Sequence, residues 1–353
     1  MFGRMMNNYY YGKSGKGDFR KDDLPSNRKE LFRDTLRTRL SGLCRLNLLY
    51  MVVFLPMMIV LMLNFTNLLS SANTLLTVKN NDYAGYVELV TANGGTASLS
   101  EEQFNELKNT EIDFSEIIDG TLFSALLWLI PCIAITGPFT TGLSYVTRNW
   151  ARDEHAFIWT DFKDAVKENW RQGLVLSCIT SVLPFAVYIG WKFYGQMAAR
   201  NPIMMVPQVL VILVAVIWSI SSTYMYPLAV TYDLKMKDVI RNGLLLGVAR
   251  LPLSIGVRLL HCLPMLIGAA LIYFWSPMIG MMILFAYYML IGFSLSRFVT
   301  ASYTNAVFDK YLNPRIEGAK VNQGIHRREV DDEDDEGGED DTAAGAGEGD
   351  AGN

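Results

Sequence analysis

The chain has 353 residues, of which 51% are hydrophobic and 19% charged, and its mean hydropathy is +0.20. This composition is too apolar and too weakly charged for an ordinary soluble enzyme of this length. The net charge of −4 hides a basic body, because 12 of the 35 acidic residues lie between Glu329 and Asp350, and a basic body is typical of membrane proteins whose cytosolic loops face anionic lipid.

Residues 1–45 are predicted to form a basic cytosolic arm that ends in an amphipathic lead-in to the membrane. Gly12, Gly15 and Gly17 stand among lysines, but no predicted strand precedes them. We therefore expect a flexible arm near lipid headgroups and not a phosphate-binding loop.

Six apolar segments are each long enough to cross a bilayer, which takes about 20 helical residues at roughly 1.5 Å per residue. They place a membrane domain over residues 46–300 and predict an all-α, polytopic membrane protein. The segments are Leu46–Leu69, Leu122–Val146, Leu174–Met197, Met204–Val230, Ile255–Trp275 and Pro277–Val299.

The distribution of Lys and Arg predicts the orientation of these spans. In chain order, the segments outside or at the edges of the spans carry 11, 2, 5, 2, 5, 0 and 6 basic residues. Since cytosolic flanks carry the positive excess, both termini are expected in the cytosol. Residues 147–173 and 231–254 would then be cytosolic loops, and residues 71–115 an outer loop.

The outer loop contains one clear helix signal. Ser100 is a candidate N-cap with Gln103 three residues later, while Phe104 and Leu107 share a face. This pattern predicts a short helix at the outer surface.

A basic and aromatic cluster follows the second span. Arg148 and Arg152 lie four residues apart on one helical face, and Trp150 stands between them. The arrangement is typical of a helix end anchored in the membrane interface, with the tryptophan at headgroup depth.

Two amphipathic helices are predicted in the cytosolic loops, each directly before a span. In the first, Phe162, Val166 and Trp170 recur every four residues, and in the second, Val239 and Ile240 share an apolar side. Such helices lie along a membrane surface or dock against a partner, so these five residues, with Arg148, Trp150 and Arg152, are our candidate docking or interface residues.

The two loops also resemble each other. Val166 and Asn169 have the same separation as Val239 and Asn242, which suggests a parallel repeat of spans 2–3 and 4–5. A helix of this kind between spans is also similar to the coupling loop of ABC-type permeases, although neither loop has the Glu-Ala-Ala start of that motif.

Arg258 and His261 lie three residues apart on one face of the fifth span. Ionisable groups inside a membrane are costly and often functional. Two interpretations stay open: Arg258 reaches back to the cytosolic interface, or the pair serves a substrate or proton.

No enzyme, metal or nucleic-acid signature is present in the sequence. The four cysteines form no C-x-x-C pair, the three histidines have no ligand spacing, and the nucleophile, phosphate-loop and zinc-protease motifs are missing. We therefore expect no catalytic residue, no cofactor and no nucleic-acid partner.

The chain is predicted to end in two cytosolic segments. Residues 301–328 form an extension of the membrane domain. Residues 329–353 are acidic and almost devoid of apolar side chains, so we expect them to be disordered.

The sequence resembles the YesL-like family of bacterial integral membrane proteins. The resemblance is carried by Gly137-Pro138, by Thr140, Thr141 and Leu143, by the cluster at 148–152 and by the segment FKDAVKENWRQ. The lead-in YYYGKSGKGDFRKDDLP and the closing SYTNAVFDKYLNP are also similar to members of that family.

This resemblance implies a role but no chemistry. The family has no settled activity, and its members usually occur beside sugar ABC transporters and polysaccharide-degrading enzymes. It therefore implies an accessory or regulatory role in carbohydrate uptake, with transporter components as partners. The alternative is a permease-like transport subunit with a pathway among the proline-bearing spans 2 to 5.

Overall fold

The computed structural model describes residues 24–110 and 114–326. All regular structure in these ranges is helical, as the sequence predicts. The first 23 residues of the arm and lead-in predicted over residues 1–45, and the acidic tail predicted over residues 329–353, lie outside the described residues.

Six helical segments of the described chain are long and apolar enough to cross a membrane, which confirms the predicted number. The first five of these segments each centre on one helix, the fourth being preceded by the short helix η2 (Pro202–Met204). The sixth segment is built from three consecutive helical pieces and ends in the short helix η4 (Asn313–Arg315). The helices are α3 (Leu40–Asn80), α6 (Phe114–Trp150), α7 (Ile158–Ala198), α8 (Met205–Thr231), α10 (Leu251–Phe274), and α11 (Pro277–Tyr287), η3 (Tyr288–Gly292) and α12 (Phe293–Tyr311).

Short helices complete the chain. They are α2 (Arg28–Thr38), α4 (Tyr83–Ala92), α5 (Glu101–Asn109), α9 (Met236–Ala249) and η4 (Asn313–Arg315). The short helix predicted to begin at Ser100 is confirmed as α5, which begins with a capping box between Ser100 and Gln103. With α4 and the end of α3 it forms a small cluster around buried Val78, Tyr86 and Phe104.

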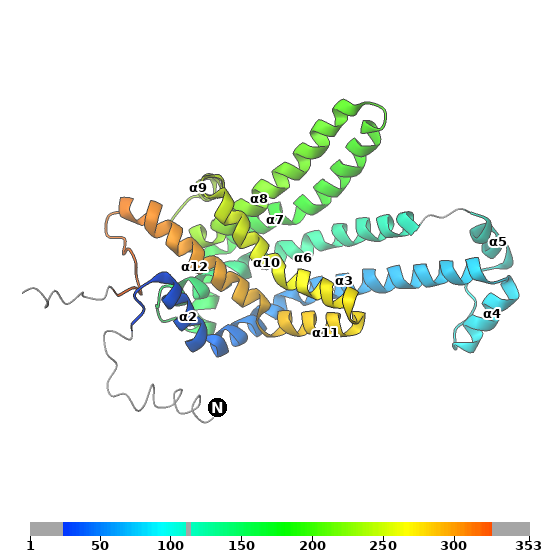
Figure 1. Cartoon of the computed structure of the whole chain (residues 1–353), viewed down its shortest axis with the longest axis horizontal. Coiled ribbons are helices and arrows are strands. Elements are labelled where there is room, and N and C mark those ends of the chain that lie inside the picture. The colour runs from blue at the N-terminus through cyan, green and yellow to red at the C-terminus, as the bar shows by residue number, and fades with distance from the viewer. Residues whose placement is uncertain (1–23, 111–113, 327–353) are drawn as a thin grey trace, which may run out of the picture.

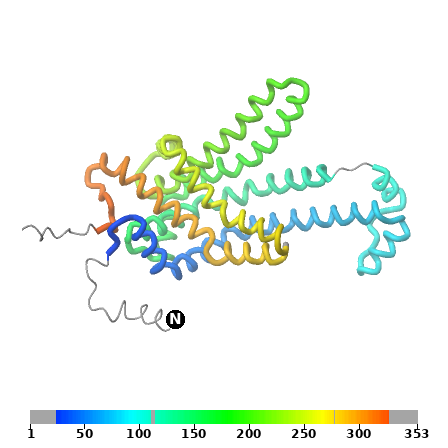
Figure 2. Tube along the Cα trace, in the orientation of Figure 1, coloured from blue at the N-terminus to red at the C-terminus, as the bar shows by residue number. Residues whose placement is uncertain are grey.

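Burial is concentrated at one end of the molecule, which we call the base. It comprises residues 136–150 of α6, 220–230 of α8 and 294–308 of α12, where most of the buried side chains lie. Beyond the base the α7/α8 pair diverges from the α3/α6 pair (Figure 1, Figure 2). The diverging halves expose large apolar side chains, as expected of surfaces that face lipid.

Helices α6 and α7 touch through their backbones at the base. A Cβ atom at Gly137 would lie 2.1 Å from the carbonyl oxygen of Gly173, and Ser177 donates a hydrogen bond to the carbonyl oxygen of Ala134 at 2.6 Å. Small residues at such a crossing bring two helices close enough for dense van der Waals contact, which drives helix association in lipid.

The two amphipathic helices bury residues at matching positions. These positions give a different register for the repeat from the one that the sequence predicts. The buried positions of α7 match those of α9 when Gly173 is aligned with Gly243, three residues away from the Val166–Val239 alignment. The segment from α2 into α3 shows the same pattern, so the unit occurs three times. The matching buried positions are Leu43, Leu46 and Asn47, then Gly173, Leu176 and Ser177, then Gly243, Leu246 and Gly247.

The copy of this unit in α3 contacts the segment from η3 into α12. Fully buried Asn47 of α3 donates through Nδ2 to the carbonyl oxygens of Tyr288 and Met289, both at 2.8 Å. Its Oδ1 accepts from the backbone N–H groups of Phe293 and Ser294, both at 3.0 Å. The polar side chain thereby satisfies backbone groups around the π-helical turn η3, where the regular α-helical ladder is interrupted.

The contact between α6 and α7 predicts a stability difference between two glycines of α6. Gly137→Ala is expected to lower the free energy of unfolding by about 3 kcal/mol, because the new methyl group meets backbone and cannot be accommodated by a side-chain movement. Chemical unfolding of the purified chain in detergent micelles measures this loss.

The matched control for this change is Gly120→Ala. A Cβ at Gly120 meets nothing within 4 Å, so this variant is expected to gain up to about 1 kcal/mol from the lower chain entropy of alanine. Equal stabilities of the two variants would contradict the close backbone contact.

Candidate functional site

The basic and aromatic cluster at residues 148–152 connects several helices of the base. The Arg148 guanidinium donates to the carbonyl oxygen of Val230 at 3.2 Å, and the carbonyl oxygen of Arg148 accepts from Asn305 Nδ2 at 3.4 Å. Arg148 thereby joins α6 to both α8 and α12. Its guanidinium also lies 3.9 Å from the Glu154 carboxylate.

Arg152 connects the α6–α7 turn to the C-terminal extension. Its guanidinium donates to Gln323 Oε1 at 2.7 Å and lies 3.8 Å from Glu154. The extension in turn meets the N-terminal part of the chain, where the backbone N–H of His326 donates to the carbonyl oxygen of Pro25 at 2.9 Å. Arg28 of α2 forms an ion pair with Asp309 of α12.

Tyr232, directly after α8, also belongs to this polar network. Its hydroxyl donates to Asn313 Oδ1 at 2.6 Å. Burial, with the Asp309 carboxylate as a second cause, raises the pKa of Tyr232 to about 12. The phenol therefore stays protonated at neutral pH and serves as a hydrogen-bond donor.

The expectation that Trp150 anchors the helix end in the membrane interface is wrong. Its side chain is only 2% exposed and is enclosed within the base. A Cβ at Gly42 of α3 would lie 3.1 Å from Cη2 of the indole. The tryptophan packs on this glycine, so it belongs to the core and not to the membrane interface.

The five candidate residues of the amphipathic helices occupy different environments. Phe162 and Val239 are buried within the chain, Val166 and Ile240 are half-buried, and Trp170 is 46% exposed. The predicted apolar sides of these helices therefore pack mainly inward. Of the five, Trp170 is the residue whose exposure best suits a contact with another molecule.

A ridge of exposed side chains runs along the first turns of α7. It consists of Trp159, which is 62% exposed, Lys163, Lys167 and Trp170. Eleven residues separate the two tryptophans, which places them on the same helical face three turns apart. We call this set the α7 ridge; the sequence pattern missed it because Trp159 lies outside the four-residue periodicity of Phe162.

The two intramembrane candidates contact different helices. Arg258 Nη2 donates to Ser222 Oγ of α8 at 2.6 Å. His261 Nε2 lies 3.0 Å from the carbonyl oxygen of Ser296 and 3.3 Å from Thr300 Oγ1, both on α12. Within the described residues no hydrogen bond joins the two side chains, although they are three residues apart.

Arg297 of α12 is a functional candidate that the sequence analysis did not identify. Its guanidinium lies over the ring of Tyr226, 5.0 Å from the centroid. It lies two residues before Val299, where the predicted sixth span ends, so the sequence pattern places it in the positive flank. Its interaction with α8 is a feature of the tertiary structure.

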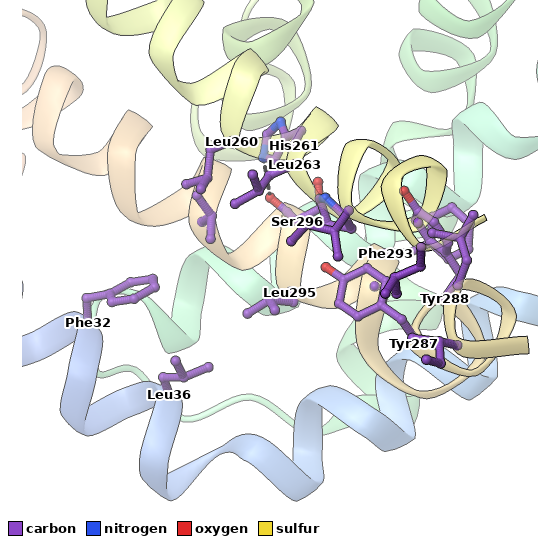
Figure 3. Close-up of a pocket in the computed structure, with 18 residues that line it drawn as sticks. Phe32, Leu36, Leu260, His261, Leu263, Tyr287, Tyr288, Phe293, Leu295 and Ser296 are labelled. Carbon is purple, nitrogen blue, oxygen red and sulfur yellow. Dashed lines mark hydrogen bonds between the residues drawn. The ribbon is translucent and has the colours of Figure 1, made fainter. Parts of the chain in front are cut away.

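An apolar cavity of about 580 Å³ lies between α2, α10 and the α11–α12 segment (Figure 3). Phe32 and Leu36 of α2 lie on one side, and Tyr287 and Tyr288 lie toward the other. His261 is a polar group in its wall. The described ranges contain no cluster of three or more His, Cys, Asp or Glu side chains suited to a metal ion.

The comparisons with known proteins identify one domain. Residues 121–191 match the model of a family described as "Protein of unknown function, DUF624". The match covers most of α6 and the greater part of α7, so it contains the close backbone contact and the α7 ridge. No curated protein and no solved structure matches the chain.

The different positions of two tryptophans predict different effects of their removal. Trp150→Ala is expected to lower the free energy of unfolding by about 3–5 kcal/mol, because it leaves a cavity beside α3. Trp159→Ala is expected to change it by less than about 0.5 kcal/mol.

Unfolding in detergent micelles, followed by far-UV circular dichroism, compares the two variants. Since both remove the same side chain, the difference between them reports position alone. Similar losses in both variants would contradict the burial of Trp150.

Proposed function

We propose that this protein is a non-catalytic integral protein of the bacterial plasma membrane that assists or regulates carbohydrate uptake by an ABC-type transporter. The base would face the cytosol, with both termini on that side. The alternation of Lys and Arg along the chain supports this orientation, and the resemblance to the YesL-like family supports the link with sugar transport.

The α7 ridge is the observation that carries the proposal. Its two tryptophans and two lysines are exposed at the base, while the opposite side of the same helix is anchored by buried Phe162 and Ala165. Aromatic residues on a rigid element are favourable anchors for protein contacts. The helix continues without interruption into a membrane-spanning segment, so a partner bound at the ridge would be held at the membrane.

The alternative, a permease-like subunit, requires a pathway among spans 2 to 5. At the base, α6 and α7 meet backbone to backbone at Gly137 and Gly173. Likewise a Cβ at Gly247 of α9 would lie 2.7 Å from Ser221 Oγ of α8. These crossings close the α6–α7 and α8–α9 pairs at the base, which supports the accessory role over a pathway through either pair.

The proposed orientation predicts which engineered cysteines can be labelled from outside the cell. In a variant without the four native cysteines, Gly95→Cys in the α4–α5 turn is expected to react with a membrane-impermeant maleimide in intact cells. Lys163→Cys on the α7 ridge is expected to react only after the cells are opened. The reverse pattern would refute the orientation.

The proposed partner predicts a position-dependent crosslink. A photoreactive phenylalanine derivative in place of Trp170 is expected to crosslink a sugar-transporter subunit in native membranes, identified by mass spectrometry. The control replaces Trp191, which is 48% exposed on the far half of the same helix, and is expected to crosslink lipid.

Two outcomes would count against this proposal. If position 170 crosslinks lipid alone, the α7 ridge does not bind a transporter subunit. Solute flux in vesicles that contain this chain with a cognate ATPase, but no other permease, would instead favour the permease alternative.

A further inference from the structure

Two arginines from different helices meet the same face of α8. Arg258 of α10 donates to Ser222, and Arg297 of α12 lies over Tyr226. Ser222 and Tyr226 are four residues apart, so they are neighbours about 6 Å apart on one helical face.

The helices around this pair provide no counter-charge. Helices α3, α8 and α10 contain no Asp or Glu, and neither do α11 and η3. The single acid of α12, Asp309, is three turns away and pairs with Arg28. The acids of α6, Glu116 and Asp119, lie near its far end, and those of α7 lie in its first turns, before residue 169.

Hydrogen-bond donors of the pair are also unused. A guanidinium group has five N–H donors. Within the described residues, Arg258 makes only its bond to Ser222, and its buried Nε has no acceptor. Arg297 donates no hydrogen bond within that same part of the chain and interacts through the ring of Tyr226.

We propose that Arg258 and Arg297, with the hydroxyl of Ser222, form a binding site for a phosphate group between α8, α10 and α12. Two adjacent guanidinium groups in apolar surroundings repel each other, and a bound anion removes that repulsion. The planar fork of each guanidinium matches the oxygens of a phosphate, which accepts two parallel hydrogen bonds from it.

The phosphate can be supplied by an anionic phospholipid or by a soluble phosphorylated compound. The surroundings favour the lipid, because Ile255 and Leu259 of α10, on either side of Arg258, expose apolar side chains on which acyl chains can lie. This site is separate from the α7 ridge, so the proposed phosphate site does not depend on the proposed protein partner.

Native mass spectrometry of the delipidated full-length chain tests the site with phosphatidylglycerol and with phosphatidylcholine. The wild-type chain is expected to retain phosphatidylglycerol more strongly. Arg258→Gln and Arg297→Gln are each expected to weaken this retention by about tenfold, the effect of losing a charge-assisted hydrogen bond. Arg241→Gln, at an exposed position of α9, is the matched control and should bind like the wild type.

A second measurement distinguishes the two sources of phosphate. If inorganic phosphate raises the midpoint of thermal unfolding of the wild type but not of the two glutamine variants, a soluble compound is the occupant. If phosphatidylglycerol raises this midpoint in the wild type and inorganic phosphate does not, the occupant is lipid. Arg258→Lys and Arg297→Lys keep the charge and are expected to give intermediate affinities.

The proposal is overturned by any of three results. One is a wild-type chain that binds phosphatidylglycerol no better than phosphatidylcholine and is not stabilised by phosphate. Another is wild-type affinity in both glutamine variants. The third is an equal loss in Arg241→Gln, which would show that surface charge accounts for the binding.

Discussion

Close approach of helix backbones at the base is the constraint on which the rest of this structure depends. Between helices in lipid there is no hydrophobic driving force, so association relies on van der Waals contact and on hydrogen bonds between helices. Gly137 and Gly173 allow the first kind of contact, and Gly243 and Gly247 repeat it between α8 and α9. Because these contacts occur at one end, the bundle is densely packed there and opens toward the other.

The base is also where the chain brings its polar groups together. Asn47 satisfies the π-helical turn before α12, and Arg148 joins three helices through backbone carbonyl groups. A buried polar network of this kind fixes one arrangement of the helices, since each unpaired group would carry a desolvation cost. The N-terminal and C-terminal segments are tied into the same network through Arg28 and Asp309.

Two features of this bundle remain available to other molecules. The α7 ridge is exposed because the inward side of its helix is already occupied by Phe162 and its neighbours. The Arg258–Arg297 pair has free donors because the single acid of α10 to α12, Asp309, lies three turns from Arg297 and pairs with Arg28. The first feature suits a protein partner and the second an anion, and the two are carried by different helices.

The sequence by itself determined the six apolar helices, the short helix after Ser100 and the absence of common enzyme motifs, because hydropathy, capping and motif spacing are local properties of the chain. It did not determine what each polar or aromatic residue contacts. Trp150 has the local signature of an interfacial anchor, yet Gly42, more than a hundred residues away, makes room for it in the core. The ridge at Trp159 and the pairing of Arg297 with Arg258 likewise depend on which helix faces which, and that is decided by tertiary packing.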